Sequence, residues 1–444
     1  MNLIYGVKDK PKFGQMLIFA FQQVLAILAA TIAVPSIIGN GMSQSAALFG
    51  AGIGTLVYQL FTRRNSPVFL GSSFAFIGSM FAAFGGAASA SAGYAGLIIG
   101  AAFAALVYVV IALGVKAVGV EWINKLMPPV VIGPTVSIIG LSLAGNAVGD
   151  LTTGKVLVDG VSACSPYVAL ICGLVTLFGV IFFSVYGKKM AKLIPFILGI
   201  LAGYVVATIF TVIGLATGNV ALQVIDLSVF SNMQIFSIPE FTFVMASKGL
   251  ADIDGAFIAT VAVAYVPVAF VVFAEHIADH KNLYSIIGQD LLADPGLHNT
   301  LLGDGVGSFA GAIFGGCPNT TYGESVGCVA ITRNASVATI TTAAVLCLLI
   351  SFFGPFVTFL ASIPNCVMGG VCITLYGFIA VSGLKMIQKV NLGSSKNLFV
   401  AAVILITGIG GLSVSFGKVT LTSIACALIL GIITNVVVAK GKDD

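Results

Sequence analysis

Residues 13–62 contain no charged side chain and read FGQMLIFAFQQVLAILAATIAVPSIIGNGMSQSAALFGAGIGTLVYQLFT. A helix that crosses a bilayer needs about 20 consecutive apolar residues, so this run is long enough for two spans and the turn between them. Strands of a membrane barrel would instead alternate polar and apolar residues in short segments. The stretch therefore predicts a bundle of transmembrane helices.

The rest of the chain has the same character. Of its 444 residues, 58% are hydrophobic and 8% are charged, and the mean hydropathy is +1.10. Because soluble domains are about one quarter charged, this composition excludes a cytosolic enzyme and a disordered protein. The net charge of +4 is small, and the basic residues fall in short clusters between apolar runs, which excludes nucleic acid as a partner. Dividing the uncharged runs at their Gly, Pro, Asn and Ser interruptions predicts an all-α membrane protein of about fourteen segments.

The basic clusters predict the orientation of these segments, because Lys and Arg in short loops stay on the cytoplasmic side. One cluster precedes the first segment, and the others follow even-numbered segments. The clusters are Lys8, Lys10 and Lys12; Arg63 and Arg64; Lys116 and Lys125; Lys188, Lys189 and Lys192; and Lys385, Lys389 and Lys396. The connections at 150–159 and 226–254 are net acidic and are expected outside. Both termini are therefore predicted to be cytoplasmic.

The chain divides into two halves, at about residues 13–216 and 254–440. Seven segments in each half give them opposite orientations, which is the inverted-repeat topology of many secondary transporters. The third segment of each half is broken, with FLGSSFAFIG at 69–78 and CPNTTYGESVG at 317–327. Non-helical backbone at membrane depth lines a cavity or is buried in protein, so we expect extended stretches and a binding site here. Two closely packed Gly-rich helices are the alternative.

Two glutamates inside apolar segments indicate where the chemistry lies. Removing a carboxylate from water is costly, so Glu275 and Glu324 are expected to face a cavity, to pair, or to take up a proton. On a helix, Glu275 and Asp279 are four residues apart and share a face. Glu275 and His280 are about 140° apart around the helix, and we expect both to border one wide cavity.

Two further polar residues have simpler interpretations. His276 is expected to be a wetted side chain at a cytoplasmic helix end. Asp304, in the sequence GDGVG at 303–307, is expected either to cap a helix or to hold the broken segment in place from a neighbouring helix.

Four motifs resemble the nucleobase/ascorbate transporter family, and within it the branch of bacterial uracil permeases. They are LGSSFAFI at 70–77, AEHIADH at 274–280, DPGL at 294–297 and PNTTYGESVGCVAITR at 318–333. The resemblance implies fourteen segments in two inverted repeats, and proton-coupled uptake of uracil by a homodimer in the bacterial cytoplasmic membrane. It implies a core domain formed by residues 13–120 and 254–353, and a gate domain formed by residues 121–253 and 354–444, through which the dimer associates.

The resemblance also implies roles for individual residues. Glu275 and Glu324 would bind the nucleobase, Phe74 and Gly323 would contact it through their backbone, and Tyr322 would lie alongside. His280 would assist proton coupling near Glu275. The supporting residues implied are Gln23, Ser73, Asp304 and Ser325. The resemblance implies no cofactor and no metal, only protons as the coupling ion.

Three departures from the family pattern keep a purine symporter for xanthine, guanine or urate as an alternative. Ser325 stands where the family usually has Asn, Gln23 stands where many members have a Gln-His pair, and Asp304 is more typical of purine-transporting members. Other classes fit less well. The sequence HIADH at 276–280 lacks the internal Glu of a zinc protease, an ion channel would show charged rings, and an anion carrier would present a positive site.

Overall fold

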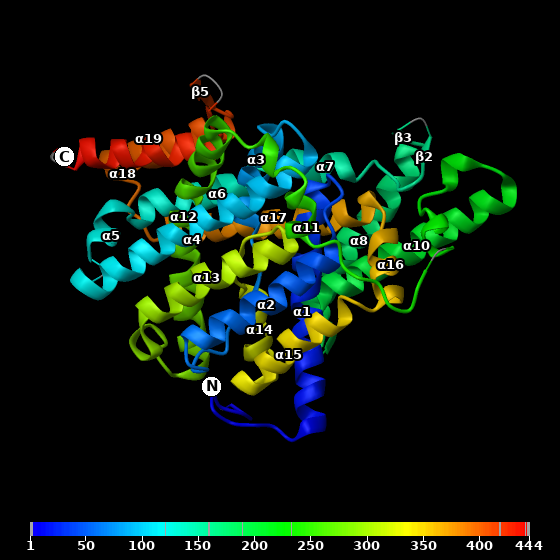
Figure 1. Ribbon diagram of the computed structural model, residues 1–444, viewed down its shortest axis with the longest axis horizontal. Coiled ribbons are helices and arrows are strands. Elements are labelled where there is room, and N and C mark those ends of the chain that lie inside the picture. The colour runs from blue at the N-terminus through cyan, green and yellow to red at the C-terminus, as the bar shows by residue number, and fades with distance from the viewer. Residues whose placement is uncertain are drawn as a thin grey trace.

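The computed structural model describes residues 3–119, 121–158, 160–188, 190–231, 233–416, 419–439 and 441, and these residues form a bundle of helices (Figure 1). Within this part of the chain, seven helical stretches are long and apolar enough to cross a membrane. They are α1 (Phe13–Ile38), α4 (Ala90–Val118), α6 and α7 (Pro129–Ser142 and Ala144–Asp150), α8 (Pro166–Tyr186), α10 (Pro195–Thr217), α12 (Gly255–Ile287) and α17 (Asn365–Ile387). The chain is thus a multi-pass helical membrane protein, as its composition predicts.

Shorter helices complete the bundle. They are α2 (Gln44–Phe61), α3 (Ile77–Gly85), α13 (Leu297–Gly315), α14 (Gly323–Thr332), α15 (Val337–Ile350), α18 (Ser395–Ile409) and α19 (Ser423–Val438). The connections contain α5 (Glu121–Leu126), α9 (Met190–Leu193), α11 (Thr242–Ser247), α16 (Gly354–Ser362), 3-10 turns at Val220–Leu222, Leu227–Phe230 and Leu250–Asp252, and a π-helical turn at Leu292–Gly296. Val120, Asp159, Lys189 and Asp444, which the sequence predictions also use, lie outside the described residues.

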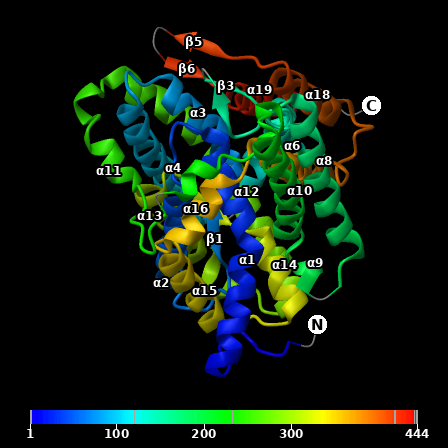
Figure 2. The ribbon, with the colours of Figure 1, turned by 90° about the vertical axis from the view of Figure 1, so that its right-hand side faces the viewer.

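The helices fall into two groups, each of which packs mainly within itself. Helix α13 packs on α2 and α4, and α12 packs on α4. In the other group, α17 packs on α6 and α8, α10 packs on α8, and α18 packs on α19 and α6. Figure 1 shows α8 and α10 at one end of the bundle and α18 and α19 along its opposite upper edge, and Figure 2 shows α1 standing upright between the two groups.

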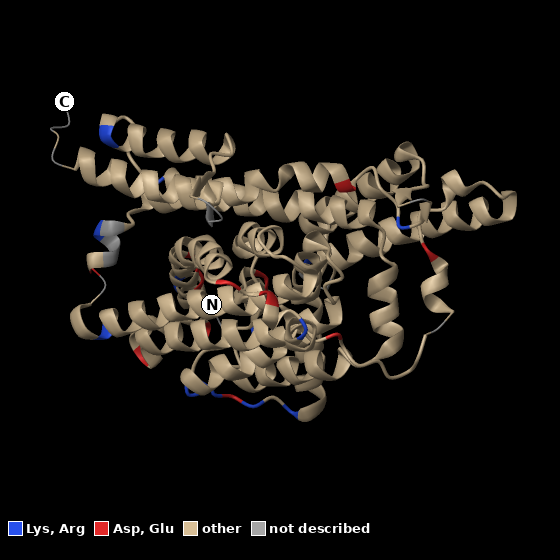
Figure 3. Cartoon of the chain, turned by 45° about the horizontal axis from the view of Figure 1, so that its top comes forward, with Lys and Arg blue, Asp and Glu red and all other residues tan. Residues whose placement is uncertain are grey.

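Charged side chains are few and are placed unevenly. Most Lys and Arg residues lie in the connections and at the helix ends, whereas several acidic residues lie within the bundle (Figure 3). The interior of the described structure therefore contains acidic residues. Because ionisable residues within membrane-spanning segments are energetically costly, they mark functional positions.

A short pair of strands interrupts the bundle at its centre. Strand β1 (Leu70–Ser72) pairs antiparallel with β4 (Asn319–Thr321), with Gly71 opposite Thr320. The extended stretches predicted in the two broken segments are therefore confirmed. The other strands form peripheral hairpins, β2 with β3 (Leu157–Val158 and Val161–Ser162) and β5 with β6 (Val414–Phe416 and Val419–Leu421).

Close packing of α2 on α13 holds the central strand pair in place. A Cβ atom at Gly54 would lie 2.8 Å from the carbonyl oxygen of Gly307, so the two backbones approach through glycine as small residues allow in membranes. Asn319 at the start of β4 donates from Nδ2 to the carbonyl oxygen of Gly50, at 3.0 Å. This bond ties the strand to α2.

Replacing Gly71 by Ala is expected to lower the free energy of unfolding by about 1–3 kcal/mol, the cost of overpacking a filled interior. The reason is that a Cβ atom on Gly71 would overlap the ring of Tyr322, which packs across the strand. Unfolding in detergent, followed by circular dichroism, measures the change. Gly85→Ala is the matched control, because a Cβ atom at Gly85 has open space around it. Equal stability of the two variants would contradict the prediction.

Candidate functional site

A cavity of about 220 Å³ lies beside the central strand pair, between it and helices α12 and α17. One wall comes from the broken segments and α12, and the opposite wall comes from α6 and α17. The lining residues are Phe74, Ala75, Val136, Glu275, Ala278, Asp279, Thr320, Thr321, Tyr322, Gly323, Glu324, Leu375, Phe378, Ile379, Ser382 and Met386. The cavity therefore lies between the two groups of helices that pack separately.

Two helices begin at this cavity. The 3-10 turn η1 (Phe74–Phe76) follows β1 and continues into α3, and α14 follows β4 and begins at Gly323. The first N–H groups of a helix have no partner within it, and they carry a partial positive charge. Both broken segments therefore present backbone hydrogen-bond donors at the cavity, because Phe74 and Gly323 both line it.

Three carboxyl groups share the cavity. Glu275 and Asp279 come from consecutive turns of α12, and Glu324 comes from the first turn of α14. The Thr321 hydroxyl donates to Asp279 Oδ2 at 2.6 Å, which ties α12 to β4. No Lys or Arg lies among the described residues that line the cavity, so its walls offer hydrogen-bond acceptors without a fixed positive side chain.

The structure brings together all five residues expected to contact a substrate. Phe74, Glu275, Tyr322, Gly323 and Glu324 line the one cavity, although they come from three segments distant in the sequence. Tyr322 is held in place, since its hydroxyl donates to the carbonyl oxygen of Ser72 at 2.7 Å.

The supporting residues lie behind the cavity wall. The Nε2 atom of Gln23 in α1 is 3.5 Å from the carbonyl oxygen of Ser325, a long hydrogen bond between α1 and α14. The Ser73 amide donates to the carbonyl oxygen of Pro318 at 2.9 Å, which extends the pairing of the broken segments. Gln23, Ser73 and Ser325 are all buried, and none is among the described residues that line the cavity.

The expectation that Glu275 and His280 border one cavity is wrong. His280 is buried away from the cavity, where its Nε2 atom lies 2.9 Å from the hydroxyl of Tyr58 in α2. The physical reason is the rotation of α12, which turns the face of Glu275 and Asp279 toward the cavity and His280 toward α2. Asp279 is thus the polar residue that the site prediction missed, and its spacing of four from Glu275 was the signal for it.

The expectations for His276 and Asp304 also change. His276 is 0% exposed rather than wetted, and its Nδ1 atom lies 2.7 Å from Asp304 Oδ2. Asp304 lies inside α13 rather than at its end, so it is not a helix cap, and it contacts α12 instead of a broken segment. This pair joins α12 to α13 behind the cavity.

Residues of α17 form the wall that sequence reasoning did not find. Phe378 and Ser382 line the cavity from this helix, and neither belongs to a recognisable motif. Phe74 meets Tyr376 of the same helix edge to face, with ring centroids 6.2 Å apart. This contact joins the broken segment to α17 at one end of the cavity.

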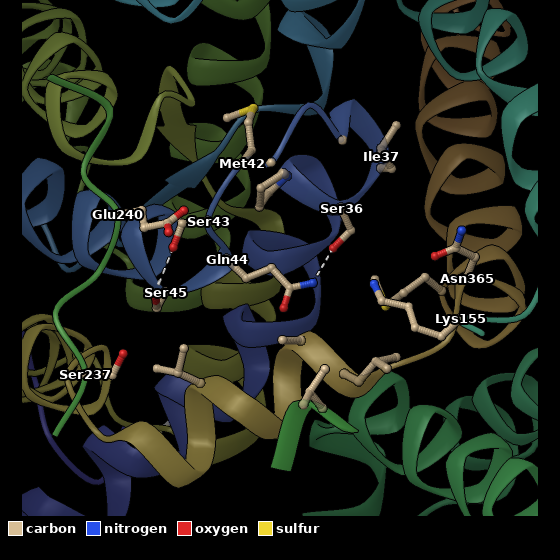
Figure 4. Close-up of a pocket in the computed structure, with 18 of the residues that line it drawn as sticks. Ser36, Ile37, Met42, Ser43, Gln44, Ser45, Lys155, Ser237, Glu240 and Asn365 are labelled. Atoms are coloured by element: carbon tan, nitrogen blue, oxygen red, sulfur yellow. Dashed lines mark hydrogen bonds between the residues drawn. The ribbon is translucent and has the colours of Figure 1, made fainter. Parts of the chain in front are cut away.

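A second and larger cavity, of about 610 Å³, lies at the C-terminal end of α1 (Figure 4). Lys155 and Asn365 lie on one side of it, Glu240 on the other, and Gln44 between them donates to Ser36 Oγ at 2.6 Å. Burial lowers the pKa of Lys155. None of the carboxyl groups of the first cavity borders this one. Helix α17 borders both cavities, because its first residue, Asn365, lines this one, and Phe378 and Ser382 farther along the helix line the first one.

Metal chemistry has no support in the part of the chain that the structure describes. Its His, Cys, Asp and Glu residues form no group of three or more that could hold a metal ion.

The sequence matches a known family over most of its length. Residues 14–416 match the model of a family described as "Permease family". The chain is 37% identical to a uracil permease of Bacillus caldolyticus, over 98% of this chain and 94% of that protein. It is 36% identical to the uracil permease of Bacillus subtilis (strain 168), over 99% and 96%, and 32% identical to that of Escherichia coli (strain K12), over 96% and 92%.

Solved structures of other transporters have the same fold. The transmembrane domain of the cyanobacterium bicarbonate transporter BicA superimposes with a TM-score of 0.63 at 18% identity, over 97% of this chain and 100% of that domain. Murine Solute Carrier 26 family member A9 superimposes with a TM-score of 0.66 at 12% identity, over 97% of this chain and 69% of that one. At these identities the likeness concerns the architecture alone.

Proposed function

This chain belongs to the Permease family, the nucleobase/ascorbate transporters, and we propose that it takes up uracil together with protons by alternating access. Its relatives are permeases, so this protein is a transporter and not an enzyme. The observation that carries the proposal is the composition of the central cavity, where three carboxyl groups from α12 and α14 lie beside the starts of two helices.

The chemistry of uracil fits this arrangement. Uracil is a flat neutral ring whose edge carries N–H donors and C=O acceptors. The carboxyl groups of Glu275 and Glu324 accept from the N–H groups, Glu275 through its carbonyl oxygen when it is protonated. Backbone N–H groups at the starts of η1 and α14 donate to the carbonyl oxygens of uracil. Phe74 and Tyr322 add apolar ring surface beside this polar edge. An anion is a poor substrate for the same cavity, whose charged lining residues are all acidic.

Proton coupling follows from the crowding of carboxyl groups. Glu275, Asp279 and Glu324 share one small cavity with no Lys or Arg in its described lining, so their negative charges repel one another. A proton bound by Glu275 or Asp279 relieves this repulsion while a neutral substrate is carried. Asp279 lines the cavity and His280 does not, so we propose Asp279 rather than His280 as the residue that assists Glu275 in proton coupling.

The order of helices supports fourteen spans in two inverted repeats. In each half, two helices precede a strand with a short helix, and four further helical spans follow. The first half runs α1, α2, β1 with α3, α4, α6 with α7, α8 and α10; the second runs α12, α13, β4 with α14, α15, α17, α18 and α19. Together with the basic clusters, this order supports cytoplasmic termini in the inner membrane.

The position of the cavity supports the division into moving parts. Its acidic wall comes from residues 13–120 and 254–353, the proposed core domain, and its other wall comes from residues 121–253 and 354–444, the proposed gate domain. Motion of one domain against the other opens the cavity to one side at a time. The second cavity, which is lined by residues within 35–45 of the proposed core domain and by Lys155 and Glu240 of the proposed gate domain, is the proposed external approach. We further propose a homodimer through the gate domains.

Uracil is favoured over a purine by the location of the three departures from the family pattern. Gln23, Asp304 and Ser325 all lie outside the described lining of the cavity, so none of them enlarges or reshapes the surface that a nucleobase touches. Competition of labelled uracil uptake by xanthine, guanine and urate tests this directly. Inhibition by a purine at concentrations equal to unlabelled uracil would favour the purine symporter.

An inward proton gradient is expected to drive accumulation of labelled uracil in vesicles that contain this protein, because protonation favours the loaded carrier. The measurement compares uptake with and without an agent that collapses the gradient. Counterflow against internal uracil is the control for carrier activity, since a channel shows none. Accumulation that is unaffected by loss of the gradient would contradict proton symport.

A further inference from the structure

A closed hydrogen-bonded group lies behind the wall of the cavity. Asp304 Oδ2 is 2.7 Å from His276 Nδ1, and His276 Nε2 is 3.0 Å from the Thr300 hydroxyl, which in turn lies 3.0 Å from the carbonyl oxygen of Leu297. His276 is 0% exposed and Asp304 is 1% exposed. Neither side chain is among the described residues that line either cavity. The group is therefore sealed from the path proposed for the substrate.

No cation compensates an ionised Asp304. The only ion pair that it makes within the described structure is with His276. The other ionisable groups that face it are Tyr58 from α2, Tyr108 from α4, and Glu275 and Asp279 from α12, which are either neutral or negative. A buried carboxylate without a countercharge is strongly unfavourable, and a carboxylate paired with a protonated imidazole would require two charges to lose their hydration. Neutral forms of both Asp304 and His276 are therefore favoured.

The hydrogen-bond directions then place the proton. The Thr300 hydroxyl donates its single hydrogen to the carbonyl oxygen of Leu297, so it accepts from His276 Nε2–H. In a neutral imidazole with a hydrogen on Nε2, the Nδ1 atom is an acceptor. Contact between two acceptors at 2.7 Å would be repulsive, so the hydrogen between them belongs to Asp304 Oδ2.

The second oxygen of Asp304 supports the same assignment. Asp304 Oδ1 is buried, and no described residue donates a hydrogen bond to it. Leaving a buried acceptor unpaired costs more when the group is charged than when it is neutral. An unpaired carbonyl oxygen of an acid is therefore tolerated here better than an unpaired carboxylate oxygen.

We propose that Asp304 is a protonated, neutral acid that donates to His276, and that this proton is fixed in place and distinct from the one that is transported. Asp304 is then a positioning residue. It holds His276 in place. Because Glu275 directly precedes His276 in α12, Asp304 thereby also holds Glu275 at the cavity. A donor chain runs in one direction from Asp304 through His276 and Thr300 to the backbone of α13.

Infrared difference spectroscopy of purified protein at neutral pH tests the protonation state without reference to transport. The spectrum of the wild type minus that of Asp304→Asn is expected to contain the C=O stretch of one protonated carboxyl group. Asp252→Asn is the matched control, because Asp252 is exposed and its difference spectrum is expected to contain carboxylate bands alone. Loss of carboxylate bands in Asp304→Asn would overturn the proposal.

Uptake measurements test whether the proton is fixed, and this second test rests on the proposed function. The Asn amide can replace the acid as donor to His276, so Asp304→Asn is expected to keep gradient-driven uracil accumulation within about 2-fold of the wild type. Asp304→Leu has no donor and is expected to lose about 10-fold or more. Asp304→Asn that exchanges uracil in counterflow but no longer accumulates it would overturn the proposal, as would Asp304→Asn that is as impaired as Asp304→Leu. Absence of counterflow in the wild type itself would instead reject the proposed function.

Discussion

Glu324→Gln is expected to weaken uracil binding by about 10- to 100-fold, the range for losing a buried hydrogen bond to a charged group. Glu324 lines the cavity from the first turn of α14, beside the backbone of Gly323. A carboxylate offers two charged acceptor oxygens to the N–H groups of uracil, whereas the Gln amide offers one neutral acceptor and adds a donor. The amide therefore both weakens one contact and opposes another.

Calorimetry of uracil binding to purified protein measures this effect. Glu121→Gln is the matched control, because Glu121 is exposed in α5 and is expected to leave the affinity unchanged. Thermal unfolding of both variants establishes that they fold equally well. An affinity of Glu324→Gln equal to that of the wild type would remove Glu324 from the binding site.

Glu275→Gln is expected to abolish uracil accumulation driven by a proton gradient while exchange of uracil persists. Glu275 shares the cavity with Asp279 and Glu324, and the Thr321 hydroxyl donates to Asp279 rather than to Glu275. It is therefore free to bind and release a proton as the cavity changes its exposure to water. Gln cannot release a proton, so the variant resembles a carrier that is permanently protonated.

The experiment compares two rates in the same vesicles. Counterflow of labelled uracil reports substrate exchange, and accumulation under an imposed gradient reports coupling. Glu275→Gln is expected to reduce accumulation by about 100-fold or more, as expected when proton binding supplies the driving force, and to reduce counterflow far less. Glu121→Gln again serves as the control. Equal accumulation in Glu275→Gln and the wild type would assign coupling to another group, of which Asp279 is the nearest along α12.

The local features of the fold could be predicted from the sequence because they depend on short stretches. Hydropathy predicted the multi-pass helical architecture, and the Gly, Ser and Thr content of 69–78 and 317–327 predicted the breaks where β1 and β4 lie. The relation between these breaks is different. No local pattern says that Leu70 pairs with Thr321, because that register depends on the packing of α2 against α13.

The candidate site was predicted in part for the same reason. Motifs identified the residues on the two broken segments and on α12, and these do meet at one cavity. The side of α12 that faces the cavity was not predictable from the sequence. The sequence prediction therefore named His280 as a residue of the cavity, whereas the structure places Asp279 there. The contact between His276 and Asp304 joins two helices whose relative rotation leaves no periodic signal in a single chain.

The sequence by itself determined that this protein is a multi-pass membrane protein with carboxyl groups in its apolar segments, because hydropathy and the cost of burying charge act residue by residue. Only the tertiary structure decided which of those groups share the cavity and which are sealed behind it. Glu275 and Asp279 face the cavity, while Asp304, which is also a carboxyl group within an apolar segment, faces His276. Rotation about a helix axis separates these outcomes, and it is set by packing between segments rather than by composition within one.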